Sequence, residues 1–100
     1  MGPIAISSNT LDLKEFFGTE ILGTREQGQL LRCLLADRIN TNELTVCDFS
    51  NVDVMTSAFA DECFGKLWDT FSHPLLKKMI RITGMSPNNQ AVFHFVLAHR

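Results

Sequence analysis

Residues 44–71 constrain the fold most, because an apolar run, a polar turn and an amphipathic helical pattern follow one another there without a break. The run 44–49 is short, mostly apolar and partly β-branched, which is typical of a strand covered on both faces. Ser50, Asn51 and Asp53 are turn formers, since short polar side chains hydrogen-bond nearby backbone and compete with regular structure. We therefore predict an interior strand in which Val46 and Phe49 are fully buried.

The pattern after this turn predicts a long amphipathic helix. Charged side chains, among them Asp61 and Glu62, alternate with the apolar ones and are expected on the solvent side. The apolar side chains recur at intervals of three and four and form one wide stripe, which consists of Phe59, Cys63, Phe64, Leu67, Trp68 and Phe71. A strand and a helix of this kind cannot bury their surfaces alone, so the rest of the chain must supply a sheet and further helices.

A capping box predicts a second helix over residues 25–39. Thr24 is followed three residues later by Gln27, so the two side chains can satisfy each other's free backbone N–H groups. A glycine in a helix interior makes the helix less stable by about 1 kcal/mol than an alanine would. Gly28 therefore indicates that another backbone approaches the helix at this position. The predicted buried face consists of Leu31, Leu34, Leu35 and Ile39, with Leu30 alongside.

The remaining segments complete an alternation of strands and helices. Residues 11–17 fit a helix ending at Gly18, with Phe16 facing inward, although an alternating strand pattern competes there. Residues 72–74 are expected to end the helix predicted after the turn, because Pro74 disfavours helix at the preceding residue. The other predicted elements are strands at 3–7, 20–22 and 78–83 and a last helix at 87–98, which is capped by Ser86 and carries Phe95 on its apolar stripe. The alternation predicts one α/β domain over residues 1–100, with helices packed on a single sheet.

Composition narrows the function classes. A net charge of −2 and a pI of about 5.8 argue against nucleic acid, which usually needs a basic face. There is no run of 18 apolar residues and no signal-peptide pattern, so we expect no membrane contact. Cys33, Cys47 and Cys63 lie in apolar patterns without zinc spacing, and we expect buried thiols in a reducing, cytoplasmic setting. No glycine-rich phosphate loop is present, so we do not expect ATP binding. With no zinc spacing among the cysteines either, no cofactor and no metal are predicted.

The stretch VCDFSNVDVMTSAFADECFGKL, residues 46–67, resembles the central motif of STAS domains, the fold of anti-sigma factor antagonists and sulphate transporter tails. It is more similar to a STAS-like family of bacterial proteins of uncharacterised function. Members of that family share the Asp-Phe pair, the helix start and the Phe-Gly-Lys-Leu segment. They also share the preceding Gly-Thr-Arg and Leu-Arg pieces, found here at 23–25 and 31–32. The resemblance spans roughly residues 21–83 and implies a mixed sheet of about four strands with helices packed on it.

The resemblance also bears on regulation. Antagonists of the anti-anti-sigma type are phosphorylated by a partner kinase on the second Ser of an Asp-Ser-Ser-Gly motif. That motif falls on Thr56, Ser57, Ala58 and Phe59, so Ala58 occupies the phosphorylated position and direct transfer fails. Thr56 and Ser57 are the neighbouring hydroxyls. Ser57 is either a phosphosite or a helix N-cap, and we favour the cap.

Three carboxylates offer an enzymatic alternative. Asp48, Asp61 and Glu62 could form an acid–base or metal cluster, but ordinary roles at a strand end and a helix start are favoured. Adjacent helix positions point about 100° apart, so Asp61 and Glu62 are not expected to converge on one point. Arg25, at a positive helix start, is expected to hold Asp48 or Asp61 in a buried polar network.

A thiol nucleophile is a weaker possibility. Cys47 or Cys63 could pair with His94, but no third group that would orient the base is recognisable. A buried structural cysteine is therefore favoured at both positions.

The leading hypothesis is a small non-enzymatic signalling or interaction module. It would dock on a protein such as a histidine-kinase-like ATPase of the anti-sigma type, through the turn and helix start at 53–62. The expected partner-binding or regulatory residues are Asp53, Met55, Thr56, Ser57, Phe59, Asp61 and Glu62. The alternatives are an enzyme that uses the carboxylates and a structural subunit that forms a homodimer through an apolar helix face.

Overall fold

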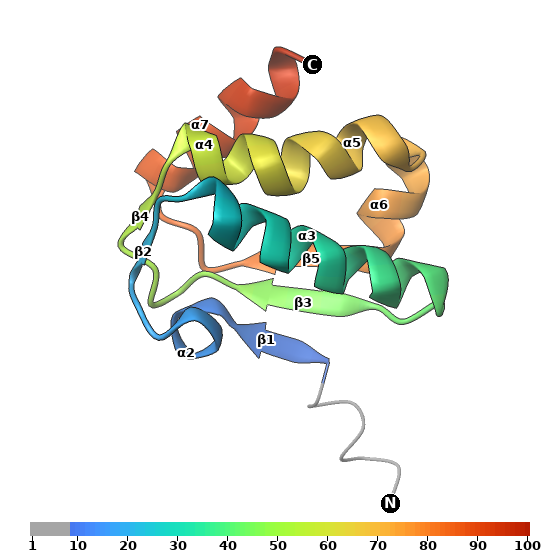
Figure 1. Ribbon diagram of the computed structural model, residues 1–100, viewed down its shortest axis with the longest axis horizontal. Coiled ribbons are helices and arrows are strands. Elements are labelled where there is room, and N and C mark those ends of the chain that lie inside the picture. Colours follow the sequence, from blue (N-terminus) through green and yellow to red (C-terminus); the bar gives the residue numbers. More distant parts are fainter. Residues whose placement is uncertain (1–8) are drawn as a thin grey trace, which may run out of the picture.

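The computed structural model describes residues 9–100, so the strand predicted at 3–7 lies outside the described residues (Figure 1). The elements are β1 (Thr10–Asp12), α2 (Leu13–Phe17), β2 (Ile21–Leu22), α3 (Arg25–Asn40), β3 (Thr45–Asp48), β4 (Val54–Met55), α4 (Ser57–Ala60), the π-helical turn η1 (Asp61–Gly65), α5 (Lys66–Thr70), α6 (His73–Met79), β5 (Ile80–Thr83) and α7 (Pro87–Ala98). Among them, no helix is long and apolar enough to cross a bilayer.

Two small parallel sheets form the strand layer. The first has the order β1-β3-β5, and the second pairs β2 with β4. The α/β class is therefore confirmed, and β3 is an interior strand as predicted. Instead of one sheet of about four strands, residues 9–100 form separate sheets of three and two, and every pairing among them is parallel. The two sheets are separate because α2 lies between β1 and β2, and the turn at residues 49–53 lies between β3 and β4.

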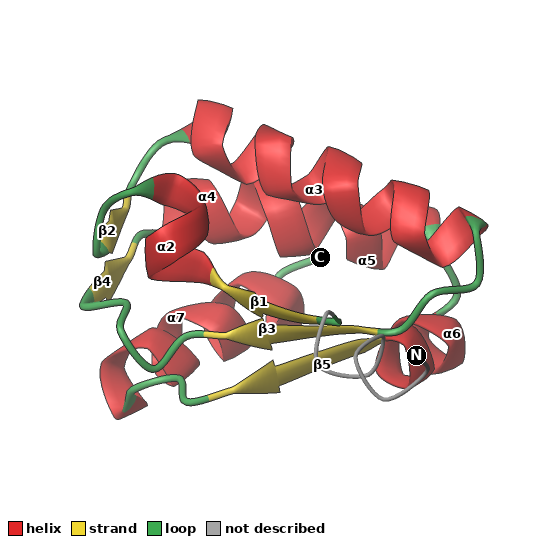
Figure 2. Cartoon of the chain, turned by 90° about the horizontal axis from the view of Figure 1, so that it is seen from below, coloured by secondary structure: helices red, strands yellow, loops and turns green. Residues whose placement is uncertain are grey.

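The helices cover one face of the larger sheet. Leu11, Cys47 and Ile82 share one row across the three strands, and Cys47 is fully buried under the helices. Val46 belongs to the next row and is only half-buried, while its neighbour Arg81 is exposed. Figure 1 shows α3 and the α4–α5 helix on one side of the strands, and Figure 2 looks onto the opposite side. The prediction that both faces are covered, with Val46 fully buried, is wrong, whereas Phe49 is fully buried directly after β3.

Helix α3 begins where the capping box predicts. The Thr24 hydroxyl accepts the Gln27 N–H at 3.1 Å, and the Gln27 side chain accepts the Thr24 N–H at 3.0 Å. One face of α3 is buried in the core and carries Leu31, Leu35 and Ile39. On the same helix Leu34 is half-buried and Leu30 is exposed.

Residues 57–70 form one helix, the central helix, in which the π turn η1 lies between α4 and α5. Its predicted apolar stripe is confirmed, since Phe59, Cys63, Phe64 and Leu67 are buried and Trp68 and Phe71 are half-buried. The π turn was not predicted.

Helix α6 was also not predicted. Ser72 and Pro74 were expected only to end the preceding helix, but Ser72 caps the next one and Pro74 lies in its first turn. As a result β5 begins at Ile80 rather than at residue 78.

Both terminal regions differ in detail from expectation. Residues 10–17 contain a strand and then a helix, with Asp12 as the N-cap and Gly18 in the left-handed conformation at the C-terminus. Phe16 was expected to face inward but is exposed. Ser86 caps α7 as predicted, yet Phe95 on its expected apolar stripe is also exposed.

Gly28 marks the approach of α3 to the central helix. A Cβ atom on Gly28 would lie 2.7 Å from the Phe59 carbonyl oxygen and 2.9 Å from Glu62 Cβ. The first of these atoms is backbone and cannot move without displacing α4, so the close approach inferred from the sequence is confirmed.

We expect Gly28→Ala to destabilise the protein by about 1–3 kcal/mol, because the overlap with α4 outweighs the gain in helix propensity. Urea denaturation of the two proteins measures the difference. The control is Gln29→Ala, at an exposed position of the same helix, which should change stability by no more than about 0.5 kcal/mol. A stabilised Gly28→Ala variant would contradict the close approach.

Candidate functional site

The expected docking residues divide into an exposed and a buried set. Asp53 and Ser57 are exposed and Thr56 is half-buried. Met55 and Phe59 are only 1% and 0% exposed. Their selection as docking residues is therefore wrong, because both side chains belong to the core that joins β4 and α4 to the sheet.

Thr56, and not Ser57, caps the central helix. The Thr56 hydroxyl oxygen accepts the Phe59 N–H at 3.2 Å and donates its own hydrogen to the Gly23 carbonyl at 3.1 Å. Ser57 is the first helical residue and its side chain is exposed. The favoured interpretation of Ser57 as the cap is thus wrong by one position, and its hydroxyl is accessible.

Asn89 fixes the turn that carries these residues, a role that no local sequence pattern indicated. Its side-chain oxygen accepts the Met55 N–H at 3.0 Å. Its amide nitrogen donates to the carbonyls of Val52 and Asp53 at 3.4 and 3.3 Å. Asn89 is itself buried, so the first turn of α7 holds the turn before α4 through three hydrogen bonds.

Glu62 is the centre of an ion cluster. Its carboxylate oxygens lie 3.0 Å from Arg32 Nη2, 2.9 Å from Lys66 Nζ and 3.3 Å from Arg25 Nη1. Arg32 Nε also donates to the Glu62 carbonyl at 2.9 Å. Glu62 was predicted on the solvent side, but its side chain is only 10% exposed because Gly28 lets α3 cover it. Lys66 first, and then Arg32 and Arg25, lower the pKa of Glu62 against the opposing effect of desolvation.

Asp61 extends this cluster to the C-terminus. Arg25 Nη1 lies 3.1 Å from Asp61 Oδ2, and Arg100 contacts both Asp61 and Asp69. Asp61 and Glu62 thus converge on one nitrogen of Arg25, contrary to expectation, because the long guanidinium comes from another helix and lies between them. The pairing of Arg25 with Asp61 is confirmed. A buried network of Arg25 with Asp48 is wrong, since Arg25 is exposed and its ion-pair partners are Asp61 and Glu62.

Asp48 has separate partners. Its Oδ1 accepts the Ser50 hydroxyl at 2.6 Å and the Ser50 N–H at 2.9 Å, and the Ser50 hydroxyl is the first cause of its lowered pKa. Within residues 9–100 no group of three or more His, Cys, Asp or Glu side chains could hold a metal ion. The structure therefore does not assemble Asp48 with Asp61 and Glu62 into one site.

Two of the cysteines are buried as expected. Desolvation raises the pKa of Cys47 to about 12 and that of Cys63 well above its usual range, so neither thiol ionises at neutral pH. Cys33 is exposed, contrary to expectation. His94 lies exposed on α7, and no hydrogen bond joins it to either buried thiol among the described residues.

The exposed Ser57 lines a small cleft between the start of α4 and the end of α7. The cleft has a volume of about 260 Å³, and Arg25, Asp61, His99 and Arg100 also line it. The structure thus places an accessible hydroxyl next to two arginines, although Asp61 already engages both.

A family profile described as a STAS-like domain of unknown function matches residues 27–90, which include most of α3 and all of β3, the central helix and β5. The chain belongs to this STAS-like family. No curated protein and no solved structure matches it. In this STAS-like domain, the segment 53–62 lies inside the matched region and Arg25 lies just before it.

We expect Glu62→Gln to lower stability at pH 7, because three cations would lose their shared carboxylate. The folded-state pKa of Glu62 lies below its ordinary value of 4.5, so its charge stabilises the fold above that value. This contribution is lost as the pH falls through the folded-state pKa. The difference in urea midpoint between wild type and Glu62→Gln should therefore shrink between about pH 6 and about pH 3.5.

The matched control is Glu26→Gln, an exposed glutamate in the first turn of α3, which should change the midpoint little at either pH. A Glu62→Gln deficit that stays constant over this range would show that the charge of Glu62 does not stabilise the fold.

Proposed function

We propose that this STAS-like domain is a small non-enzymatic interaction module that docks on a protein partner through the surface around β4 and the start of α4. The observation that carries the proposal is a pair of exposed apolar side chains beside the accessible polar ones. Ile21 and Val54 are direct neighbours in the β2–β4 pairing and are 54% and 41% exposed. Asp53 and Ser57 lie on the same segment as Val54.

This surface is held in a fixed shape. The β2–β4 pairing, the bond from Thr56 to the Gly23 carbonyl and the three hydrogen bonds of Asn89 join it to α3 and α7. A preorganised apolar patch with a polar rim loses little conformational entropy on binding and is typical of protein interfaces. The arrangement supports docking more than it supports chemistry.

The environment of the carboxylates favours this function over an enzyme. The Asp48 carboxylate accepts a hydrogen bond from Ser50, while the carboxylates of Asp61 and Glu62 form ion pairs with arginine and lysine side chains. A general base needs a carboxylate that can reach a substrate proton, and these carboxylates are engaged elsewhere. Membership of a STAS-like family is consistent with a small non-enzymatic module.

The partner we propose is a histidine-kinase-like ATPase of the anti-sigma type. The argument is the resemblance of the sequence around residues 53–62 to the central motif of anti-sigma factor antagonists. A structural homodimer is the alternative, since Leu30 on α3 and Phe95 on α7 are also exposed.

Val54→Lys should weaken the complex with such an ATPase at least about tenfold, because a charge would be desolvated at the centre of the interface. The measurement is isothermal titration calorimetry, in which this protein is titrated into each purified ATPase domain of this type encoded in the same genome. Leu30→Lys, at a comparably exposed apolar position on α3, is the control and should bind like wild type. Binding by none of the ATPases, or equal losses in both variants, would contradict the proposal.

The second part of the proposal is that modification of Ser57 regulates docking. Ser57→Asp should keep the thermal midpoint and weaken the partner complex, because a negative charge enters the rim of the interface. Ser57→Ala should also keep the midpoint, since the structure assigns the cap to Thr56, and it should bind normally. By contrast Thr56→Ala should cost about 0.5–2 kcal/mol of stability. A Ser57→Asp variant that binds as tightly as wild type would end the regulatory idea while leaving docking itself intact.

A further inference from the structure

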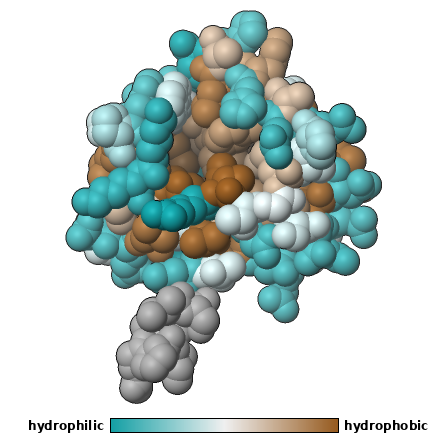
Figure 3. All heavy atoms as spheres, turned by 180° about the vertical axis from the view of Figure 1, so that it is seen from behind, coloured by the Kyte–Doolittle hydropathy of each residue, from teal (hydrophilic) through white to brown (hydrophobic). Residues whose placement is uncertain are grey.

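A second surface feature lies away from the segment 53–62. It is an apolar cavity of about 430 Å³ between β5 and the helices α5, α6 and α7. Figure 3 shows hydrophobic side chains gathered around a hollow on this face of the molecule. Its walls include Phe64 and Trp68 from the central helix, Leu76 from α6, Ile82 from β5, and Phe93 and Leu97 from α7.

The cavity is built on fixed side chains. Phe64 is buried and packs edge-to-face on Phe93, with ring centroids 5.2 Å apart and an interplanar angle of 74°. Trp68 stacks on His73 at the start of α6, with centroids 3.4 Å apart. Phe64 also belongs to the π turn, and interruptions of this kind in a helix frequently accompany functional sites. The aromatic walls are therefore in place before anything binds.

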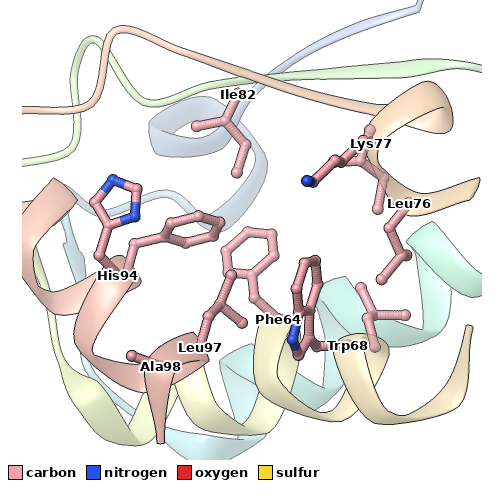
Figure 4. Close-up of a pocket in the computed structure, with 11 residues that line it drawn as sticks. Phe64, Trp68, Leu76, Lys77, Ile82, His94, Leu97 and Ala98 are labelled. Carbon is pink, nitrogen blue, oxygen red and sulfur yellow. The ribbon is translucent and has the colours of Figure 1, made fainter. Parts of the chain in front are cut away.

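The polar groups of the cavity are basic. Among residues 9–100, Lys77 from α6 and His94 from α7 are the titratable residues that line the cavity, and no carboxylate of these residues lines it. Figure 4 shows Lys77 extending its ammonium group over the cavity from one side, with His94 at the other. Among the described residues Lys77 forms no ion pair, so its charge is free to meet an anion.

We propose that this cavity binds a small apolar molecule that carries one carboxylate, of the class of medium-chain fatty acids. The hydrocarbon part lies against Phe64, Trp68 and Phe93, and the carboxylate accepts hydrogen bonds from the Lys77 ammonium group. A volume of 430 Å³ falls in the range of ligand pockets, roughly 300–1,000 Å³. It is also well above the ~150 Å³ of a cavity that holds benzene, so a chain of roughly ten carbons fits.

The chemistry of the lining favours this ligand over a peptide or a second copy of the chain. An extended peptide carries a donor and an acceptor on every residue, and a wall that is almost entirely apolar leaves most of them unpaired. A hydrocarbon chain with one charged end matches an apolar cavity that is lined by one lysine, Lys77.

The protein contains one reporter for binding, because Trp68 is its single tryptophan and lines the cavity. The probe is decanoate, titrated below the concentration at which it forms micelles, with Trp68 fluorescence as the readout. We expect a saturable change in emission with one site per chain. 1-Decanol, which has the same chain without the charge, should bind at least about tenfold more weakly. No saturable response to decanoate, or equal affinity for both molecules, would overturn the proposal.

Two pairs of variants localise the site. Lys77→Ala should weaken decanoate binding about tenfold and leave 1-decanol unaffected, whereas Lys78→Ala, at the neighbouring exposed residue that does not line the cavity, should behave like wild type. Ala98→Phe should place a ring inside the cavity and abolish binding, while Ala91→Phe, exposed on α7 at a residue that does not line the cavity, should not. Equal effects within either pair would place the ligand elsewhere.

Analytical ultracentrifugation of the free protein tests whether a second copy of the chain covers the cavity instead. A monomer whose Trp68 responds to decanoate supports the proposal. A dimer that shields Trp68 and does not respond to decanoate overturns it, because a second copy then covers the cavity. None of the cavity residues belongs to the segment 53–62, so failure of this test leaves the proposed docking function untouched.

Discussion

The contact between α3 and the central helix is the constraint on which the rest of the structure depends. Gly28 has no side chain, and the Phe59 carbonyl and the Glu62 side chain fill the space that one would need. This approach covers Glu62, which would otherwise face solvent. Once covered, a carboxylate needs cations, and Arg25 and Arg32 on α3 and Lys66 one turn along the central helix supply them. Packing and charge pairing therefore specify the same relative position of the two helices.

The same contact sets the position of the candidate docking surface. The central helix begins at Thr56, whose hydroxyl bonds both the helix and the Gly23 carbonyl just before α3. Arg25 in the first turn of α3 then holds Asp61 one turn into the central helix. The starts of the two helices are thus joined by a cap and an ion pair, and the short β2–β4 pairing projects its exposed side chains beside them.

Helix α7 separates the two surfaces with functional potential. Its first turn holds the loop before α4 through Asn89, and its buried Val96 packs in the core. Its other side, with Phe93 and Leu97, leaves an apolar cavity toward β5 and α6. A short helix that packs against the central helix cannot also cover the edge strand β5, and the cavity is the result.

Local sequence patterns specify the parts of the fold that depend on neighbours three or four residues apart. The capping box at Thr24, the cap at Ser86 and the apolar stripe of the central helix were all predicted in this way, and the interior position of β3 was predicted from a short apolar run. The close approach at Gly28 and the pairing of Arg25 with Asp61 were also predicted, because a glycine and a cation in unfavourable helix positions need a tertiary reason. Helix α6 was missed because Ser72 and Pro74 end one helix as readily as they begin another.

The accessibility of the site residues, by contrast, depends on tertiary packing. Met55, Phe59 and Glu62 lie in a segment that resembles a regulatory surface, yet the sheet and α3 bury them. Thr56 rather than Ser57 became the cap because its hydroxyl also reaches the Gly23 carbonyl, 33 residues away in the chain. Asn89 acquired its role through groups 34 or more residues distant. Caps and periodicity are encoded over one helical turn, whereas burial depends on which distant element comes to lie on top, and local pattern does not contain that information.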